Sequence, residues 1–187
     1  MTNFITRLAT TAVALPLTLG GMAPQAQAFS NMYQVGPAHN QLIDAVRSTG
    51  IQFIVNGSKC ETDGGGFAGY YWAAKNEMVI CQDNRNGSRH QHEVRWTAND
   101  LDTLRHEAQH LVQDCMAGHY RDGRLGAVYQ DPISLAKQVL GYSNIRSILE
   151  AYSDESQHTQ VMELEAFSVA ALNDPLEQVR DIQKFCF

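Results

Sequence analysis

The chain has 187 residues, of which 44% are hydrophobic and 18% charged, with a formal net charge of −6. This length predicts one domain, and the apolar content predicts a packed core and argues against a disordered chain. No block of Lys or Arg accompanies the acidic balance, which argues against nucleic acid and anionic membrane surfaces as main partners.

Residues 1–28 have the pattern of a secretory signal peptide. Arg7 supplies the positive start, an apolar run follows, and Ala26-Gln27-Ala28 gives a small-x-small cleavage signature before Phe29. The alternative, an uncleaved anchor, is disfavoured because the apolar run is short and interrupted by Pro and Gly. We therefore expect a secreted or periplasmic protein whose mature domain spans 29–187, with no stable membrane anchor after cleavage.

The first half of the mature chain predicts a short helix and a small sheet. The helix is expected at 40–48, before Gly50, and a first strand at 51–55. Two further strands, at 67–74 and 77–81, are expected to form an antiparallel hairpin. A Gly-rich loop precedes the hairpin and is interpreted as a turn, because it lacks the order of a phosphate-binding loop.

The second half is predominantly helical. Thr97 is a plausible N-cap with Asp100 at the third helical position, and this helix is expected to end near Ala117-Gly118. Asp131-Pro132 is typical of another helix start. Further helices are predicted at 143–151, 154–173 and 176–185. A few strands followed mainly by helices indicate an α+β fold in one domain.

Four cysteines lie in the predicted mature chain, at positions 60, 81, 115 and 186. An even number in an exported chain predicts two disulfides, for which three connectivities exist. We favour Cys60 with Cys81, which closes the Gly-rich loop, and Cys115 with Cys186, which ties the C-terminus to the central helix. Cysteine metal ligation is disfavoured because no C-x-x-C spacing occurs.

The central helix carries the pattern His106-Glu107-Ala-Gln-His110. Residues four apart lie one turn apart on the same helical face, so the two imidazoles can bind one metal ion. Glu107 lies at the edge of that face, where it can accept a proton from a metal-bound water. This pattern is that of a zinc metallopeptidase, with Zn²⁺ as the cofactor. The alternative is that the two histidines lie solvated on the surface and bind no metal.

The helix has an apolar side opposite its histidines, which predicts a back packed on the core and a front that opens on a cleft. A further pair of histidines, His90 and His92, is interpreted as part of a polar loop, although metal binding by this pair is an alternative.

A catalytic zinc usually has three protein ligands and an open position. The segment 160–170 is apolar on nearly every side yet contains Glu163 and Glu165, which lie about 200° apart on a helical wheel. A buried carboxylate is costly unless it is paired or binds a metal. At most one of the two is expected to reach the metal. The alternative is that both are ion-paired or solvated.

The histidine motif, followed by Glu163-Leu-Glu-Ala166, resembles the gluzincin metallopeptidases of the zincin superfamily. In several such families the third ligand begins a Glu-x-x-Ala pattern on a later helix. The resemblance therefore implies a zincin-like domain with His106, His110 and Glu163 as metal ligands and Glu107 as general base. Phe167 stands where many of these families have Asp or Asn, and Glu165 remains the alternative ligand.

The expected activity is hydrolysis of peptide bonds in a peptide or protein substrate by a zinc-activated water. Transition-state stabilisation requires a further donor, for which His158 and Tyr152 are the main candidates, and His119 and Tyr120 further ones. By analogy with zincin-like folds, the strand at 67–74 is a hypothetical substrate-binding strand. The alternative functions are a catalytically inactive metal-binding domain and a secreted, disulfide-stabilised binding module.

Overall fold

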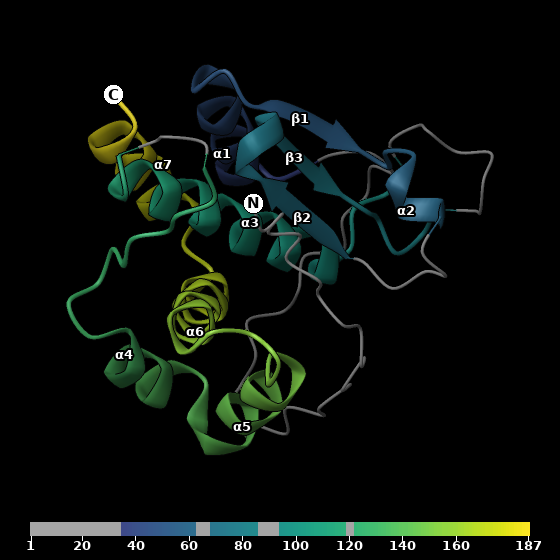
Figure 1. The fold of residues 1–187 in the computed structure, drawn as a ribbon. Coiled ribbons are helices and arrows are strands. Elements are labelled where there is room, and N and C mark those ends of the chain that lie inside the picture. Colours follow the sequence, from purple (N-terminus) through teal and green to yellow (C-terminus); the bar gives the residue numbers. More distant parts are fainter. Residues whose placement is uncertain (1–34, 63–67, 86–93, 119–121) are drawn as a thin grey trace, which may run out of the picture.

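A computed structural model describes residues 35–62, 68–85, 94–118 and 122–187. Helices accompany a small sheet in these ranges, with α1 and α3 packed against it, so the predicted α+β class is confirmed (Figure 1). Three sets of predictions lie outside the described residues. They are the signal peptide (1–28), the glycine triplet (64–66) and the candidate residues His90, His92, His119 and Tyr120. The elements are β1 (Gln52–Val55), β2 (Gly69–Trp72), β3 (Glu77–Ile80), α1 (Pro37–Ser48), α2 (Lys59–Thr62), η1 (Ala73–Lys75), α3 (Ala98–Met116), α4 (Pro132–Val139), α5 (Gly141–Ala151), α6 (Gln157–Leu172) and α7 (Pro175–Phe185).

The sheet has the order β1-β3-β2 and is mixed. The predicted hairpin is confirmed, because β2 and β3 pair antiparallel with Tyr71 opposite Met78. β1, however, pairs in parallel with β3, with Phe53 opposite Met78. The predicted antiparallel sheet is therefore a mixed one. The central strand is the most deeply buried one, because its residues 78–80 are fully buried. The order therefore places the most deeply buried strand where both edges are covered.

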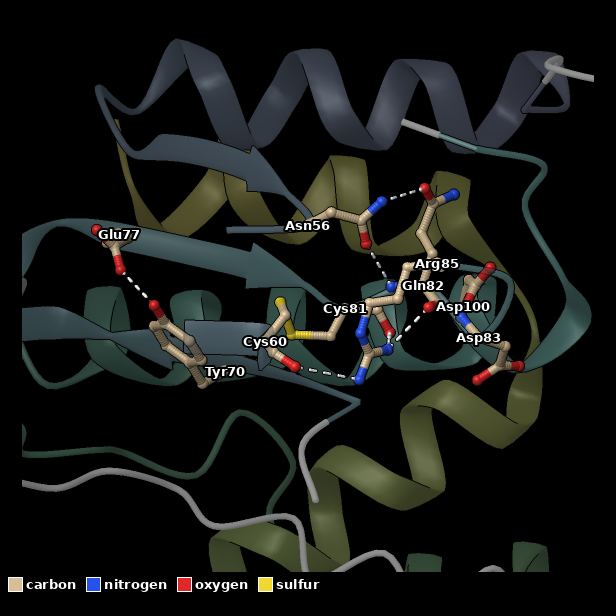
Figure 2. Close-up of a disulfide and its surroundings, with 9 residues drawn as sticks. All are labelled: Asn56, Cys60, Tyr70, Glu77, Cys81, Gln82, Asp83, Arg85 and Asp100. Carbon is tan, nitrogen blue, oxygen red and sulfur yellow. Dashed lines mark hydrogen bonds between the residues drawn. A yellow bond between two sulfur atoms is a disulfide. The ribbon is translucent and has the colours of Figure 1, made fainter. Parts of the chain in front are cut away.

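A disulfide between Cys60 and Cys81 joins α2 to the end of β3, as the preferred pairing predicted (Figure 2). Arg85 reinforces this corner by donating hydrogen bonds to the carbonyl oxygens of Cys81 and Gln82, at 3.0 and 2.8 Å. Beside it, the buried Asn56 side chain accepts from the Gln82 backbone N–H. The start of the chain segment after β3 is thus held by covalent and polar contacts as well as by packing.

Helix α3 is the centre of the fold. It packs against β2 and β3 and also against α6, while α4 and α5 lie beyond α6, away from the sheet (Figure 1). The second predicted disulfide, Cys115–Cys186, fastens its last turn to the C-terminus just after α7. Leu104, Ala108 and Leu111 form its fully buried apolar face. α3, the motif helix that carries His106 and His110, is therefore packed between the sheet on one side and α6 on the other.

A buried arginine links three of these helices. The Arg105 guanidinium donates to the Ala170 carbonyl at 2.9 Å, pairs with Asp102 at 3.0 Å and contacts the His39 ring at 2.8 Å. Burial, with the neighbouring positive charge of Arg105, lowers the pKa of His39 from 6.5 to about 4. A neutral His39 can accept the arginine's hydrogen bond, so α1, α3 and α6 are joined as long as this imidazole stays uncharged.

Candidate metal centre

The histidine helix begins with a complete capping box. The Thr97 side chain accepts from the Asp100 backbone N–H, and the Asp100 carboxylate accepts from the Thr97 N–H. This pair satisfies two donors that a helix start would otherwise leave unpaired, and it fixes where α3 begins. The helical phase of every residue that follows is set from this point, including the two histidines one turn apart.

His106, His110 and Glu163 come together as a compact group that can hold a metal ion, with one ligand atom from each lying within 4.8 Å of the others. The two Nε2 atoms are 3.0 Å apart. One Glu163 oxygen lies 3.3 Å from His106 Nε2 and the other lies 3.5 Å from His110 Nε2. α3 supplies the two nitrogens, and α6, packed across it, supplies the carboxylate.

These separations fit a common metal ion. With metal–nitrogen bonds of about 2.0–2.1 Å and a tetrahedral arrangement, neighbouring ligand atoms lie about 3.3 Å apart. Glu163 Oε2 is also buried, and it faces His106 Nε2 without forming a hydrogen bond of standard geometry among the described residues. A buried carboxylate oxygen of this kind is costly unless a cation satisfies it. The donor set of two imidazoles and one carboxylate thus suits a divalent metal, and zinc is among the ions that such sets bind.

The electrostatics of the three residues favour positive charge between them. Burial acts to lower the pKa of His110, but the charge and hydrogen bond of Glu163 raise it to about 9. Burial acts to raise the pKa of Glu163, but the two histidines lower it to about 2. The carboxylate is therefore held in its charged form, and the space next to it stabilises a cation.

Glu107 lies beside the group and is completely buried. Burial raises the pKa of its carboxyl, against the opposing effects of His106 and His110. Neither of its oxygens has a hydrogen-bond partner of standard geometry among the described residues. The strand β2 runs alongside, because a Cβ on Gly69 would lie 3.4 Å from Glu107 Cγ. The Tyr71 backbone N–H interacts with this carboxyl group and acts to lower its pKa, but no hydrogen bond of standard geometry among the described residues uses its oxygens.

The two carboxylates of α6 have different surroundings. Glu163 faces the histidines, whereas Glu165 is fully buried and accepts hydrogen bonds from two glutamine side chains and two backbone N–H groups, those of Gln109, Gln113, Val128 and Tyr129. These donors satisfy both Glu165 oxygens. Of the two predicted alternatives, Glu163 is the carboxylate that the fold brings to the histidines.

The two main candidates for a transition-state donor are placed differently. Tyr152, at the end of α5, is 4% exposed, and its hydroxyl makes no hydrogen bond of standard geometry among the described residues. Burial, the charges of Glu163 and Glu107 and a side-chain interaction with Glu163 raise its pKa. His158 is exposed in the first turn of α6 and contacts the Leu125 carbonyl at 2.9 Å. Tyr152 is therefore near the group, while His158 contacts a loop.

The motif helix differs from expectation in its exposure. His106 and His110 are 2% and 1% exposed, so the predicted open front is buried. Tyr71 Oη donates to Asp114 at 2.7 Å and helps to hold β2 against this part of the helix. A helical wheel distinguishes polar from apolar faces, but it does not reveal that a second helix will cover the polar one.

A family model described as a domain of unknown function (DUF8637) matches residues 4–187. The chain belongs to the DUF8637 family. Among curated proteins and among solved structures, the comparisons found no match.

Two residues of the site were missed at the sequence level. Gln113 contacts His110 Nδ1 at 2.9 Å, and the Phe167 ring packs 4.4 Å from the His106 ring, centroid to centroid. A polar residue three positions after His110 was an available signal, because i and i+3 side chains are neighbours on a helix. Phe167, noted in the sequence only as a departure from a family pattern, gives His106 an aromatic wall.

The surroundings of the DUF8637 chain are constrained by its covalent structure. Its two disulfides are typical of an extracellular or otherwise oxidising environment. None of the helices in the described ranges has the length and apolar character needed to cross a membrane.

Proposed function

We propose that this protein is an exported zinc-dependent peptidase of gluzincin type, acting on a peptide or protein substrate. The observation that carries the proposal is the convergence of His106, His110 and Glu163, with Glu107 next to the first histidine on the same helix. Two imidazoles and a carboxylate form one of the ligand sets used by catalytic zinc, and Glu107 occupies the sequence position of the base.

Each residue has a distinct role in this proposal. Zinc, when bound, would lower the pKa of a bound water and polarise the substrate carbonyl. Glu107 accepts a proton from the attacking water and later delivers it to the leaving amine. Its two oxygens lack standard hydrogen-bond partners among the described residues, which supports this role because an acceptor already engaged would be a poorer base.

Tyr152 is the proposed donor to the oxygen that becomes negatively charged. Support comes from its buried hydroxyl, which lies at the end of α5 close to Glu163 and makes no hydrogen bond of standard geometry within the described part of the chain. A preorganised donor in a dry site contributes strongly to transition-state stabilisation. His158 is a weaker candidate, since its ring contacts the Leu125 carbonyl.

β2 is the proposed binding strand for the substrate backbone. It ends the β1-β3-β2 order, and Gly69 brings it against Glu107. An extended peptide added to a sheet edge gains main-chain hydrogen bonds. Because the metal ligands are buried, substrate entry requires displacement of part of what covers them.

That burial also favours a second candidate, a zincin-like metal-binding domain without catalytic activity. Structural metal sites are closed, whereas catalytic sites keep an open position. Under this alternative, Glu107 would have no proton to transfer, and its replacement would leave the properties of the metal-bound protein largely unchanged.

The test combines metal analysis with cleavage of a fluorescent general protein substrate. The purified protein is expected to bind zinc in a one-to-one ratio and to cleave the substrate, and Glu107→Gln to retain zinc but lose cleavage. Zinc binding without cleavage in either form would favour the non-catalytic domain. A folded protein that binds no metal would refute both and favour a disulfide-stabilised binding module.

The ligand assignment is tested separately with Glu163→Ala, which is expected to lose zinc affinity. The result contrary to the assignment is loss of zinc in Glu165→Ala with retention in Glu163→Ala. Export is tested by mass spectrometry of the protein recovered outside the cytoplasm. Its N-terminus is expected at Phe29, and an N-terminus at Met1 would contradict a cleaved signal peptide.

A further inference from the structure

We propose that Gln113, anchored by Glu165, is a positioning residue that presents His110 Nε2 to the metal. This inference rests on the proposed metal site. Gln113 lies one turn after His110 on α3, and its side chain is fully buried. Its Oε1 atom lies 2.9 Å from His110 Nδ1, the ring nitrogen that faces away from Glu163.

The orientation of the Gln113 amide follows from its other contacts. Its nitrogen lies 3.0 Å from the Met162 carbonyl oxygen and 3.0 Å from Glu165 Oε1. A carbonyl and a carboxylate only accept hydrogen bonds, so the amide NH₂ must point at them. The amide oxygen is then the atom that faces His110.

The orientation of the amide determines which nitrogen of His110 is free. An amide oxygen accepts only, so Nδ1 must carry the hydrogen of this contact. In a neutral imidazole the lone pair is then on Nε2, the atom directed at His106 and Glu163. A metal-binding histidine typically donates its other N–H to such a partner, which fixes both tautomer and ring orientation.

Glu165 holds the glutamine in place. It also accepts from Gln109 at 3.0 Å and from the backbone N–H groups of Val128 and Tyr129 at 3.1 Å. These donors come from α3 and from the segment before α4, so the carboxylate is fixed from two directions. All of these donors are uncharged N–H groups. Glu165 therefore forms no ion pair with them, and it can also accept a hydrogen bond from Gln113.

The two histidines are held by different means. His106 Nδ1 is buried without a hydrogen-bond partner among the described residues, and its ring packs on Phe167. The polar control of ring orientation therefore acts on His110. Loss of an outer contact of this type typically weakens metal binding by about 10–100-fold.

The experiment measures Zn²⁺ affinity of the full mature chain by competition with a chromophoric chelator. Gln113→Leu is expected to bind Zn²⁺ about 10–100-fold more weakly than wild type. Gln109→Leu is the matched control: it removes a neighbouring buried amide that also contacts Glu165 but does not touch His110, and it is expected to bind Zn²⁺ nearly as wild type does.

Two further measurements separate positioning from general damage. The visible absorption spectrum of the Co²⁺-loaded protein reports ligand geometry, and it is expected to change in Gln113→Leu but not in Gln109→Leu. The exchange variant Gln113→Glu with Glu165→Gln restores an acceptor against His110 and a donor at position 165, but it leaves the Met162 carbonyl without its donor. It is therefore expected to recover part of the affinity. It also serves as the test if Gln113→Leu fails to fold.

The outcomes are distinct. Wild-type Zn²⁺ affinity and Co²⁺ spectrum in a folded Gln113→Leu variant would overturn the positioning role and leave the proposed peptidase intact. Equal losses in the Gln113 and Gln109 variants would also overturn it, because a structural effect would then explain both. Absence of Zn²⁺ binding by wild type would overturn the proposed function and this inference together.

Discussion

Replacement of Gly69 by alanine is expected to separate β2 from the motif helix. A Cβ at this position would lie 2.6 Å from Thr103 Cγ2 and 2.8 Å from the Val79 carbonyl oxygen. The second of these atoms belongs to the backbone of β3, so it cannot rotate away. β2 must therefore shift relative to β3, and relief of the Thr103 overlap moves it away from α3. Glu107, whose Cγ is the next nearest atom, lies at the same contact.

The magnitude follows from the overlap. Inserting one methyl group into a packed contact typically costs about 1–3 kcal/mol. For a chain of this size, each kcal/mol corresponds to a shift of about 2–4 °C in the melting temperature. Gly69→Ala is thus expected to lower the free energy of unfolding in urea by this amount, measured without added metal so that only packing is compared.

Thr103→Ser supplies the rescue for this variant. It removes Cγ2 but keeps the hydroxyl that donates to the Asn99 carbonyl. The double variant should recover part of the loss, because one of the two overlaps disappears. Gly36→Ala is the matched control, since its Cβ would meet no atom within 4 Å and its φ of −60° suits alanine. Unchanged stability in Gly69→Ala, or no recovery in the double variant, would refute the close approach of strand and helix.

Three further predictions concern other features. The pKa of His39 is lower in the folded than in the unfolded chain, so its contribution to stability is complete above pH 6.5 and is lost as pH falls towards about 4. Urea unfolding at pH 7 and pH 5 should therefore show a smaller loss of unfolding free energy on acidification for His39→Gln than for wild type. An equal loss in the two proteins would contradict the role of the Arg105 contact. Removing the Cys115–Cys186 disulfide should lower the free energy of unfolding by about 4 kcal/mol, and removing Cys60–Cys81 by about 3 kcal/mol, because the two bonds close loops of 71 and 21 residues. The measurement is calorimetry of the two double serine variants. A larger loss for the Cys60–Cys81 variant would argue against loop entropy as the main contribution. Chelation of the zinc-loaded protein should remove about 2.7 kcal/mol of stability if free zinc had been at 100 times Kd, and the melting temperature should fall accordingly and recover when zinc is restored. A melting temperature that does not depend on zinc would contradict binding to the folded state.

The elements with local signals were predictable from the sequence. Thr97 and Asp100 form the expected capping box, and Asp131 caps α4 ahead of Pro132. The predicted start of α1, residue 40, is late, because Pro37 is the first helical residue and a Gly-Pro pair also suits a turn. Proline fits that position since its missing N–H would have no helical partner. Local chemistry thus determined most boundaries, with ambiguity where one residue suits both a turn and a helix start.

The arrangement of elements was less accessible to sequence reasoning. Alternation of apolar residues identified the hairpin, but it does not encode that β1 pairs in parallel with β3. The two histidines followed from helical spacing alone. By contrast, the roles of Glu163 and Glu165 depend on how α6 crosses α3, since one faces the histidines and the other a pair of glutamines and a loop. Contacts between distant elements are set by packing, which no local pattern specifies.

The two disulfides follow one another along the chain without crossing, at 60–81 and 115–186. In a chain that enters an oxidising compartment N-terminus first, Cys60 and Cys81 can pair before Cys115 enters. Once they have paired, the remaining two thiols of this sequence have only each other as partners, so entry in chain order favours the native connectivity. The Cys115–Cys186 bond can form only after a further 71 residues, so α3 is tied to the segment after α7 later than the first disulfide closes.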